Sequence, residues 1–342
     1  MIESGVEKEV ADKLETLEQG VDEWNRWRRH GGAHQLVLEQ IDLSESELAG
    51  VDFSGVNAMG AEFFGSDLAG ANLKMSNFDK TDFSQANLGS IGAYKVGFEN
   101  AYLVEANLEG ADLSEGNLRG ADLRGANLRD ADLQGADLQG ARLDRTDLTG
   151  ASLAGANVSG ASFSYANFDN ANLTAMIYGG YRKMTGLYFG VRGLENSYGN
   201  AMFVRDARDQ DYIDTLDRTI DRLPEGSLKT FERRLFRAWA LIDYGRSLFK
   251  VTFYAFLLAF LYACIYSLDM NLGWGMMDYS SSANSWFTPF YYSIVTYTTL
   301  GFGDVTANNW IGEILVISEV IVGYFTLGLL LAILANTIAR RS

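Results

Sequence analysis

The chain has 342 residues and a formal net charge of −16, with 44 acidic and 28 basic side chains. The acidic excess is concentrated in residues 41–175, which carry a net charge of −12 and therefore disfavour binding to nucleic acid or anionic lipid. One cysteine and two histidines supply neither a disulfide nor a histidine-based catalytic centre, and no nucleophile–base pair or phosphate loop is present in the sequence, so we expect a protein that is not an enzyme.

Residues 1–40 contain an amphipathic segment. Between residues 6 and 29, apolar side chains recur four and three residues apart and so line one face of a predicted helix: Val10, Leu14, Leu17, Val21 and Trp24. Two interpretations are open. The apolar face either caps the domain that follows or pairs with the same face of another subunit in a coiled coil.

Residues 41–175 repeat a five-residue pattern without an insertion for 27 units. The centre of each unit is mostly Leu or Phe, as at Leu43 and Phe53, and the residue two positions earlier is mostly Ala. In an extended chain, a spacing of two places both side chains on the same side. Glycine often follows two residues after the centre, where a corner is needed. The pattern therefore predicts a closed coil with two inward side chains on each side.

This pattern resembles the pentapeptide-repeat family over about 135 residues. The resemblance implies a right-handed, four-sided parallel β-helix, in which 27 units form nearly seven coils. Acidic members of that family imitate DNA and bind topoisomerases. A solvated scaffold surface accounts for the same charge, and we expect no nucleic acid partner here. An unidentified cytoplasmic ligand or partner of the repeat domain is an open alternative.

Residues 176–230 are predicted to form a linker that contains a charged helix at about residues 204–223 and ends at Pro224-Glu225-Gly226. Residues 231–248 mix aromatic and basic side chains. That composition suits a helix lying on the inner membrane surface, although a lengthened start to the next segment explains it too.

The C-terminal section, residues 249–342, is predicted to be a membrane domain. The apolar runs 249–268 and 311–339 are each long enough to cross a bilayer, and the shorter run 286–298 suits a helix that enters a membrane without crossing it. No Lys or Arg occurs from 251 to 339, whereas basic residues flank that block. The positive-inside rule therefore predicts a multi-pass protein of the inner (plasma) membrane with both termini in the cytoplasm.

A glycine-spaced segment follows the short run. A potassium filter replaces the hydration shell of the ion with rings of backbone carbonyls, and glycine reaches the required backbone conformations at low cost. The chain thus has a long helix, a short helix followed by a glycine-rich segment, and a second long helix. This order resembles the pore module of the potassium channel family over residues 249–341. The resemblance assigns the filter to Thr298, Thr299, Leu300, Gly301, Phe302, Gly303 and Asp304, with K⁺ bound at Thr299, Leu300, Gly301 and Phe302.

A filter of this kind needs several copies around one axis, so a homotetramer is expected. Helical spacing and the resemblance predict that Tyr324, Leu327, Leu331 and Ala335 line the inner cavity. Leu331 is a candidate apolar gate that closes by dewetting. Gly323 is a candidate hinge, with close helix packing as the alternative.

Glu319 is an acid inside the second span, where a charge is costly. Three roles are open for it: a buried acid that braces the filter from the direction of Tyr297 or Thr298, a proton sensor, or a cation site.

The sequence thus predicts a tetrameric two-span potassium channel with a cytoplasmic repeat domain that takes part in gating. It has no cofactor, and K⁺ is the permeant ion. The alternatives are a non-selective cation channel of the same architecture and a membrane-tethered scaffold whose repeats bind a partner.

Overall fold

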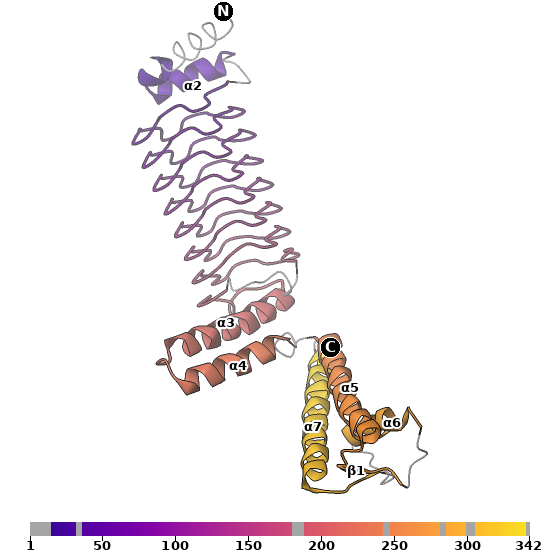
Figure 1. Ribbon diagram of the computed structural model, residues 1–342. Coiled ribbons are helices and arrows are strands. Elements are labelled where there is room, and N and C mark those ends of the chain that lie inside the picture. The colour runs from indigo at the N-terminus through magenta and orange to yellow at the C-terminus, as the bar shows by residue number, and fades with distance from the viewer. Residues whose placement is uncertain are drawn as a thin grey trace, which may run out of the picture. The chain divides into compact units, whose positions relative to one another are not determined.

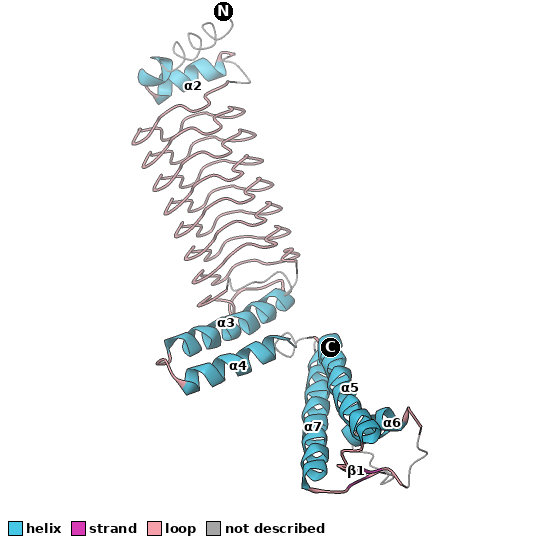
Figure 2. Ribbon diagram, in the orientation of Figure 1, coloured by secondary structure: helices cyan, strands magenta, loops and turns pink. Residues whose placement is uncertain are grey.

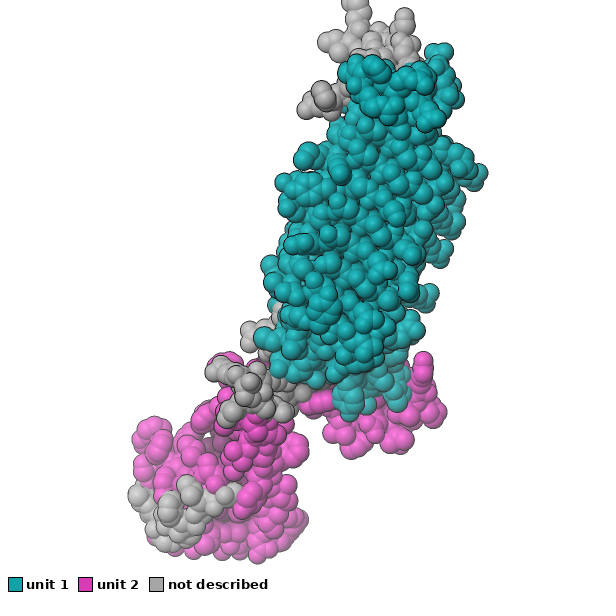
Figure 3. Space-filling view, turned by 180° about the vertical axis from the view of Figure 1, so that it is seen from behind, with its two compact units in different colours: residues 1–219 teal, residues 220–342 magenta. Residues whose placement is uncertain are grey.

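The computed structural model describes residues 15–31, 36–179, 188–241, 247–280, 285–298 and 305–339. The chain divides into two compact units, residues 1–219 and 220–342, which Figure 3 shows in different colours. The elements, all but β2 labelled in Figure 1, are α2 (Val21–Arg29), α3 (Ala201–Arg222), α4 (Ser227–Leu241), α5 (Leu248–Leu272), β1 (Met277–Asp278), α6 (Thr288–Tyr297), β2 (Thr306–Ala307) and α7 (Trp310–Ala339).

The first unit is built on a parallel β-helix. Each bridge joins a residue to the residue 20 positions later, from Val37–Asn57 to Asn157–Ile177, so one coil contains four five-residue sides. Figure 2 colours these coils as loops, and backbone hydrogen bonds join each coil to the next on every side. The β-helix predicted for residues 41–175 is confirmed, and its bridges begin before residue 41 and continue past residue 175.

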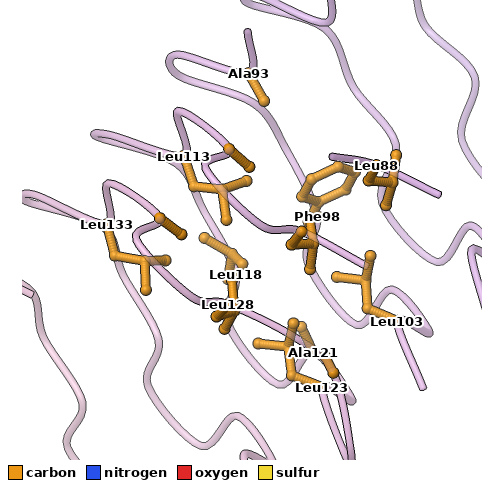
Figure 4. Packing of buried hydrophobic residues seen from close by; sticks show 14 of the residues in the cluster. Leu88, Ala93, Phe98, Leu103, Leu113, Leu118, Ala121, Leu123, Leu128 and Leu133 are labelled. Carbon is orange, nitrogen blue, oxygen red and sulfur yellow. The ribbon is translucent and has the colours of Figure 1, made fainter. Parts of the chain in front are cut away.

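The interior of the coils contains the two inward side chains of each unit. Leu113 and Leu133, which are one coil apart, are both fully buried and lie in successive coils in Figure 4. Phe63 and Phe83 are also one coil apart, and their rings stack with centroids 4.9 Å apart. Stacking like residues on successive coils fills the interior at the density that folded cores require.

The corners of the coils place one residue per unit in the left-handed backbone region. Glycine occupies many of these positions, but Glu115 (φ 54°) and Tyr165 (φ 63°) adopt the same conformation. A non-glycine residue in this region costs about 1–2 kcal/mol. The bridges on either side of each corner fix its backbone, so the coil geometry and not the corner residue determines the conformation.

The N-terminal helix differs from the prediction of one helix over residues 6–29. Residues 15–18 form a helical turn. The helix is interrupted at Gln19 and Gly20 (φ 120°), and α2 begins at Val21. Val10 and Leu14 lie outside the described residues. A glycine with this φ interrupts a helix because its backbone leaves the helical region.

The helix α2 covers the open edge of the first coils. Trp24 is fully buried, its indole nitrogen donates to the carbonyl of Asp52 at 2.8 Å, and its ring lies 5.5 Å from that of Phe53. The Asn25 side chain accepts from the amide of Asp52 at 2.8 Å and donates to the carbonyl of Gly50 at 2.9 Å. Polar backbone groups at this edge therefore have partners, and the apolar face of α2 is occupied within its own chain.

The charged helix predicted at about residues 204–223 is present as α3, but the described segment before it, predicted as part of a linker over residues 176–230, belongs to the β-helix. Arg192 and Tyr198 form parallel bridges to the last coils, and α3 then packs on the end of the β-helix. Phe203 is fully buried, with its ring 5.8 Å from that of Phe168. Asn200 begins α3 by accepting from the amide of Phe203 at 3.0 Å. Residues 188–219 thus close the second end of the unit.

In the second unit, α4 overlaps the predicted helix at 231–248 and starts before it, and residues 242–246 lie outside the described residues. Leu228, Phe231 and Leu235 on α4 are each more than half exposed. The helices α5 and α7 are long and apolar enough to cross a membrane. Both extend the predicted spans, since α5 continues to Leu272 before Gly273 ends it with φ 65°. The short helix α6 is slightly shorter than the predicted run 286–298.

Replacing Trp24 with Ala is expected to destabilise the first coils by about 3 kcal/mol or more, because it leaves a cavity and removes the partner of the Asp52 carbonyl. Hydrogen exchange of the amides at residues 57–62 in the full chain measures this. The control Met75→Ala alters a side chain that is 64% exposed and should change stability by less than about 0.5 kcal/mol. Equal protection in the two variants would show that α2 does not cap the β-helix.

Candidate pore

Small side chains let α5 approach the short helix α6. Ala255, Ala259 and Ala263 recur every four residues on α5 and are buried. Ala255 and Ala259 pack with Tyr297 of α6, and Val322 of α7 lies against the same cluster. Because apolar side chains do not drive helices together in lipid, close contact of small residues contributes much of the association. The three helices thus form one packed group around α6.

Glu319 lies inside this group and is fully buried. One carboxyl oxygen, Oε2, accepts from the Tyr266 hydroxyl of α5 at 2.7 Å, and the other, Oε1, is hydrogen-bonded to Ser293 of α6. The predicted direction towards α6 fits, but the expected neighbours Tyr297 and Thr298 are not its hydrogen-bond partners. Ser293 lies one turn before Tyr297, a difference that the crossing of the helices determines and that spacing along one helix does not show.

Gly323 of α7 lies directly against the end of α6. A side chain at this position would overlap the backbone carbonyl oxygen of Tyr297. Three residues later, the Thr326 hydroxyl donates to the Tyr297 hydroxyl at 3.0 Å. By contrast, nothing lies within 4 Å of the place that a side chain at Gly328 would take. The contacts of Gly323 therefore favour close packing over a free hinge.

The predicted filter begins where α6 ends. Thr298 ends α6, and its hydroxyl donates to the carbonyl of Ile294 at 2.7 Å. The other predicted filter residues lie outside the described residues, and their role stays a prediction: Thr299, Leu300, Gly301, Phe302, Gly303 and Asp304. The chain is described again from Val305, which is buried beside Tyr266 and Met277.

Hydrogen bonds tie the segment after the predicted filter to the segment after α5. The strands β1 and β2 pair antiparallel, with Met277 opposite Ala307. Asp269, near the end of α5, is buried and accepts from the amides of Met276 and Met277 at 2.9 and 3.0 Å. The sequence analysis missed Asp269, although an acid four residues before the helix-ending Gly273 is an available signal for a carboxylate that binds backbone amides.

The four residues predicted to line the cavity lie along α7 and are exposed in the single chain: Tyr324, Leu327, Leu331 and Ala335. Exposure does not single out this face, because Ile321 and Phe325 are equally exposed. A groove of about 320 Å³ between α5, α6 and α7 reaches Thr298 and Leu327, and its lining is almost entirely apolar. Such surfaces are suited to lipid or to another membrane helix.

Tryptophans mark the same end of the membrane helices. Trp274 follows α5, Trp286 precedes α6 and Trp310 begins α7, and each is more than half exposed. Tryptophan is enriched where a membrane meets water, so these positions are consistent with one interface at this end.

Comparison with protein families identifies two matching sections. Residues 249–340 match the model of the ion channel family, and residues 59–90, 101–140 and 141–175 match pentapeptide repeats. The chain is thus similar to a membrane ion channel in its second unit and to repeat proteins in its first. No curated protein matches the sequence.

Solved structures of repeat proteins are similar to the first unit. QnrB1, a plasmid-mediated fluoroquinolone resistance protein, is 20% identical; the match covers 52% of this chain and 96% of QnrB1, with a TM-score of 0.36. HetL, a pentapeptide repeat protein involved in heterocyst differentiation regulation in Nostoc sp. strain PCC 7120, is 23% identical; the match covers 53% of this chain and 98% of HetL, with a TM-score of 0.20.

Replacing Gly323 with Ala is expected to lower the free energy of unfolding in detergent by about 1–3 kcal/mol, because the added methyl group meets the Tyr297 backbone. Gly328→Ala is the matched control on the same helix, and its effect should stay within about 0.5 kcal/mol. Thermal and denaturant unfolding of both variants measure the difference. If both proteins are as stable as the parent, Gly323 is not a packing contact.

Proposed function

Because the chain joins pentapeptide repeats to a two-span ion channel domain, we propose that it conducts potassium ions passively and selects them over sodium. The observation that carries this proposal is the position of the glycine-spaced segment 298–304, which follows the short helix α6 and precedes α7. Backbone carbonyls in such a segment replace the hydration shell of the ion. The proposed K⁺ sites are the carbonyls of Thr299, Leu300, Gly301 and Phe302.

The proposed pore is a homotetramer. One chain supplies one strip of carbonyls, and a ring around the ion needs several strips related by symmetry. The exposed apolar face of α7 supports this proposal, since in a tetramer it is covered by neighbouring helices or lines a central cavity. In that assembly Tyr324, Leu327, Leu331 and Ala335 line the cavity.

The proposed orientation places both termini in the cytoplasm and the pore in the inner (plasma) membrane. Residues 251–339 contain no Lys or Arg, whereas Arg233, Arg234 and Arg237 of α4 precede α5. The β-helix is then cytoplasmic. It is connected in sequence to α5 through residues 220–247, and we assign it a role in gating that an unidentified cytoplasmic ligand or partner controls.

Reconstitution into vesicles tests the proposal. The purified protein should pass K⁺, and its reversal potential with K⁺ on one side and Na⁺ on the other should report strong preference for K⁺. Gly301→Ala or Gly303→Ala should reduce K⁺ flux to the background, because the added side chain disturbs the carbonyl rings. Gly226→Ala, at a loop position with no neighbour within 4 Å, is the control.

A reversal potential near zero under these two-ion conditions would replace the proposal with a non-selective cation channel. The absence of flux in all conditions, with the tetramer intact, would instead favour a membrane-tethered scaffold protein.

Leu331 is the proposed apolar gate. Leu331→Asp should raise the current of the closed channel at least about tenfold, because a charged side chain keeps a narrow apolar passage hydrated. Leu331→Ile conserves the apolar surface and should keep the closed current low. Single-channel recording of both variants measures this, and an unchanged closed current in Leu331→Asp contradicts a gate at this position.

A further inference from the structure

The buried carboxyl group of Glu319 has an unusual set of neighbours. The Ser293 hydroxyl contacts two oxygens at once: the carbonyl oxygen of Ala259, at 2.7 Å, and Oε1 of Glu319. The Tyr266 hydroxyl donates to Oε2 at 2.7 Å. These contacts join four residues from three helices, and only the hydroxyl groups of Ser293 and Tyr266 supply hydrogens for them if Glu319 is ionised.

Counting those hydrogens decides the protonation state. A serine hydroxyl carries one hydrogen, and a carboxylate carries none. If Glu319 were ionised, Ser293 could donate its one hydrogen either to Ala259 or to Glu319. In the other contact two oxygen atoms would face each other with no hydrogen between them and would repel. If Oε1 is protonated, Glu319 donates to Ser293, Ser293 donates to Ala259, and each contact has its own hydrogen. A buried polar group without its hydrogen bond costs about 1–3 kcal/mol.

The charges around Glu319 agree with this count. The titratable groups that face it are phenols, from Tyr266 on α5 and from Tyr292 and Tyr297 on α6. On its own helix, the neighbouring Ser318 is paired with Tyr262. The other buried acid of these helices, Asp269, has the wrong sign to be a partner.

The membrane segment around Glu319 offers no cationic side chain. Residues 251–339 contain no Lys, Arg or His, so neither this segment nor the same segment of a second copy supplies a basic partner. A buried carboxylate without a counter-ion is strongly disfavoured.

We propose that Glu319 is held as a neutral carboxylic acid, with its proton on Oε1, and that this proton joins the three helices. Glu319 of α7 donates to Ser293 of α6, and Ser293 donates to Ala259 of α5, while Tyr266 of α5 donates back to Oε2. Glu319 is therefore a positioning residue for α6. Its effect on the filter, through the end of α6 at Thr298, rests on the proposed function.

Infrared spectroscopy of the full-length protein in lipid vesicles at pH 7 tests the protonation state directly. A carboxylic acid has a C=O stretching band that a carboxylate lacks. The difference spectrum between the parent protein and Glu319→Gln should contain this band. The signals of the other acids are the same in both proteins and cancel in the difference. The control Glu313→Gln, at an exposed position on α7, should leave the band in place. Its absence from the Glu319→Gln difference overturns the proposal.

A second variant keeps the test independent of Glu319 itself. Tyr266→Phe removes the hydrogen bond to Oε2, so the same band should move to higher wavenumber, and an unmoved band means that the acid is a different residue. These readouts do not require ion flux, so the proposed channel function and this proposal can fail separately.

Thermal unfolding adds a structural comparison. Glutamine has the hydrogen-bonding pattern of the neutral acid, with its NH₂ facing Ser293 and its carbonyl facing Tyr266. Glu319→Gln should therefore unfold near the temperature of the parent, whereas Glu319→Met, of similar length but without polar atoms, should unfold several degrees lower. If Gln lowers the unfolding temperature as much as Met does, the ionised form is the correct one.

Discussion

The second unit depends on how the ten-residue helix α6 is held between two long helices. A helix of this length does not cross a bilayer, so in a membrane the groups at its ends need partners from protein. Two contacts hold α6 through backbone groups. The Ser293 hydroxyl is hydrogen-bonded to the Ala259 carbonyl of α5, and Gly323 of α7 leaves room for the Tyr297 carbonyl of α6. The alanines of α5 and the glycine of α7 follow from this requirement, because any larger side chain would move α6 away from its hydrogen bonds.

The first unit meets the same requirement by repetition. Each coil supplies backbone partners to the next, as the amide of Asn72 does to the carbonyl of Val51 at 2.9 Å, so only the two ends are incomplete. The helix α2 closes one end through Trp24 and Asn25, and residues 188–219 close the other through Phe203. Caps of this kind keep a repeat structure from pairing end to end with other copies.

The parts that the sequence predicted well are those with a long, uniform pattern. Five-residue spacing predicted the coil because the same inward positions are buried in every unit, whereas the length and apolar composition of two runs predicted α5 and α7. The caps have no such pattern. Gly20 divides the first helix, and the bridges of Arg192 and Tyr198 no longer keep the 20-residue offset, so the β-helix extended beyond its predicted end.

The candidate pore shows a second limit of sequence reasoning. An acid in an apolar run identifies Glu319 as a residue with partners, but Ser293 and Tyr266 are 26 and 53 residues away from it and become neighbours only through the crossing of three helices. The backbone roles of Asp269 and Gly323 depend on the same crossing. The filter residues 299–304 lie outside the described residues, so their assignment rests on the glycine spacing, on the flanking helices α6 and α7 and on the resemblance to the pore module.

The helix α5 holds a special position in this arrangement. It supplies both the Ala259 carbonyl and the Tyr266 hydroxyl, and it is the membrane helix that continues the chain from α4. A shift of α5 along its axis would change its hydrogen bonds to α6 and α7 together, whereas a bend of α7 beyond Thr326 would leave these contacts in place. In the proposed channel, a signal from the repeats therefore reaches the start of the filter through α5 and α6, and the buried acid of α7 determines how firmly those two helices move as one.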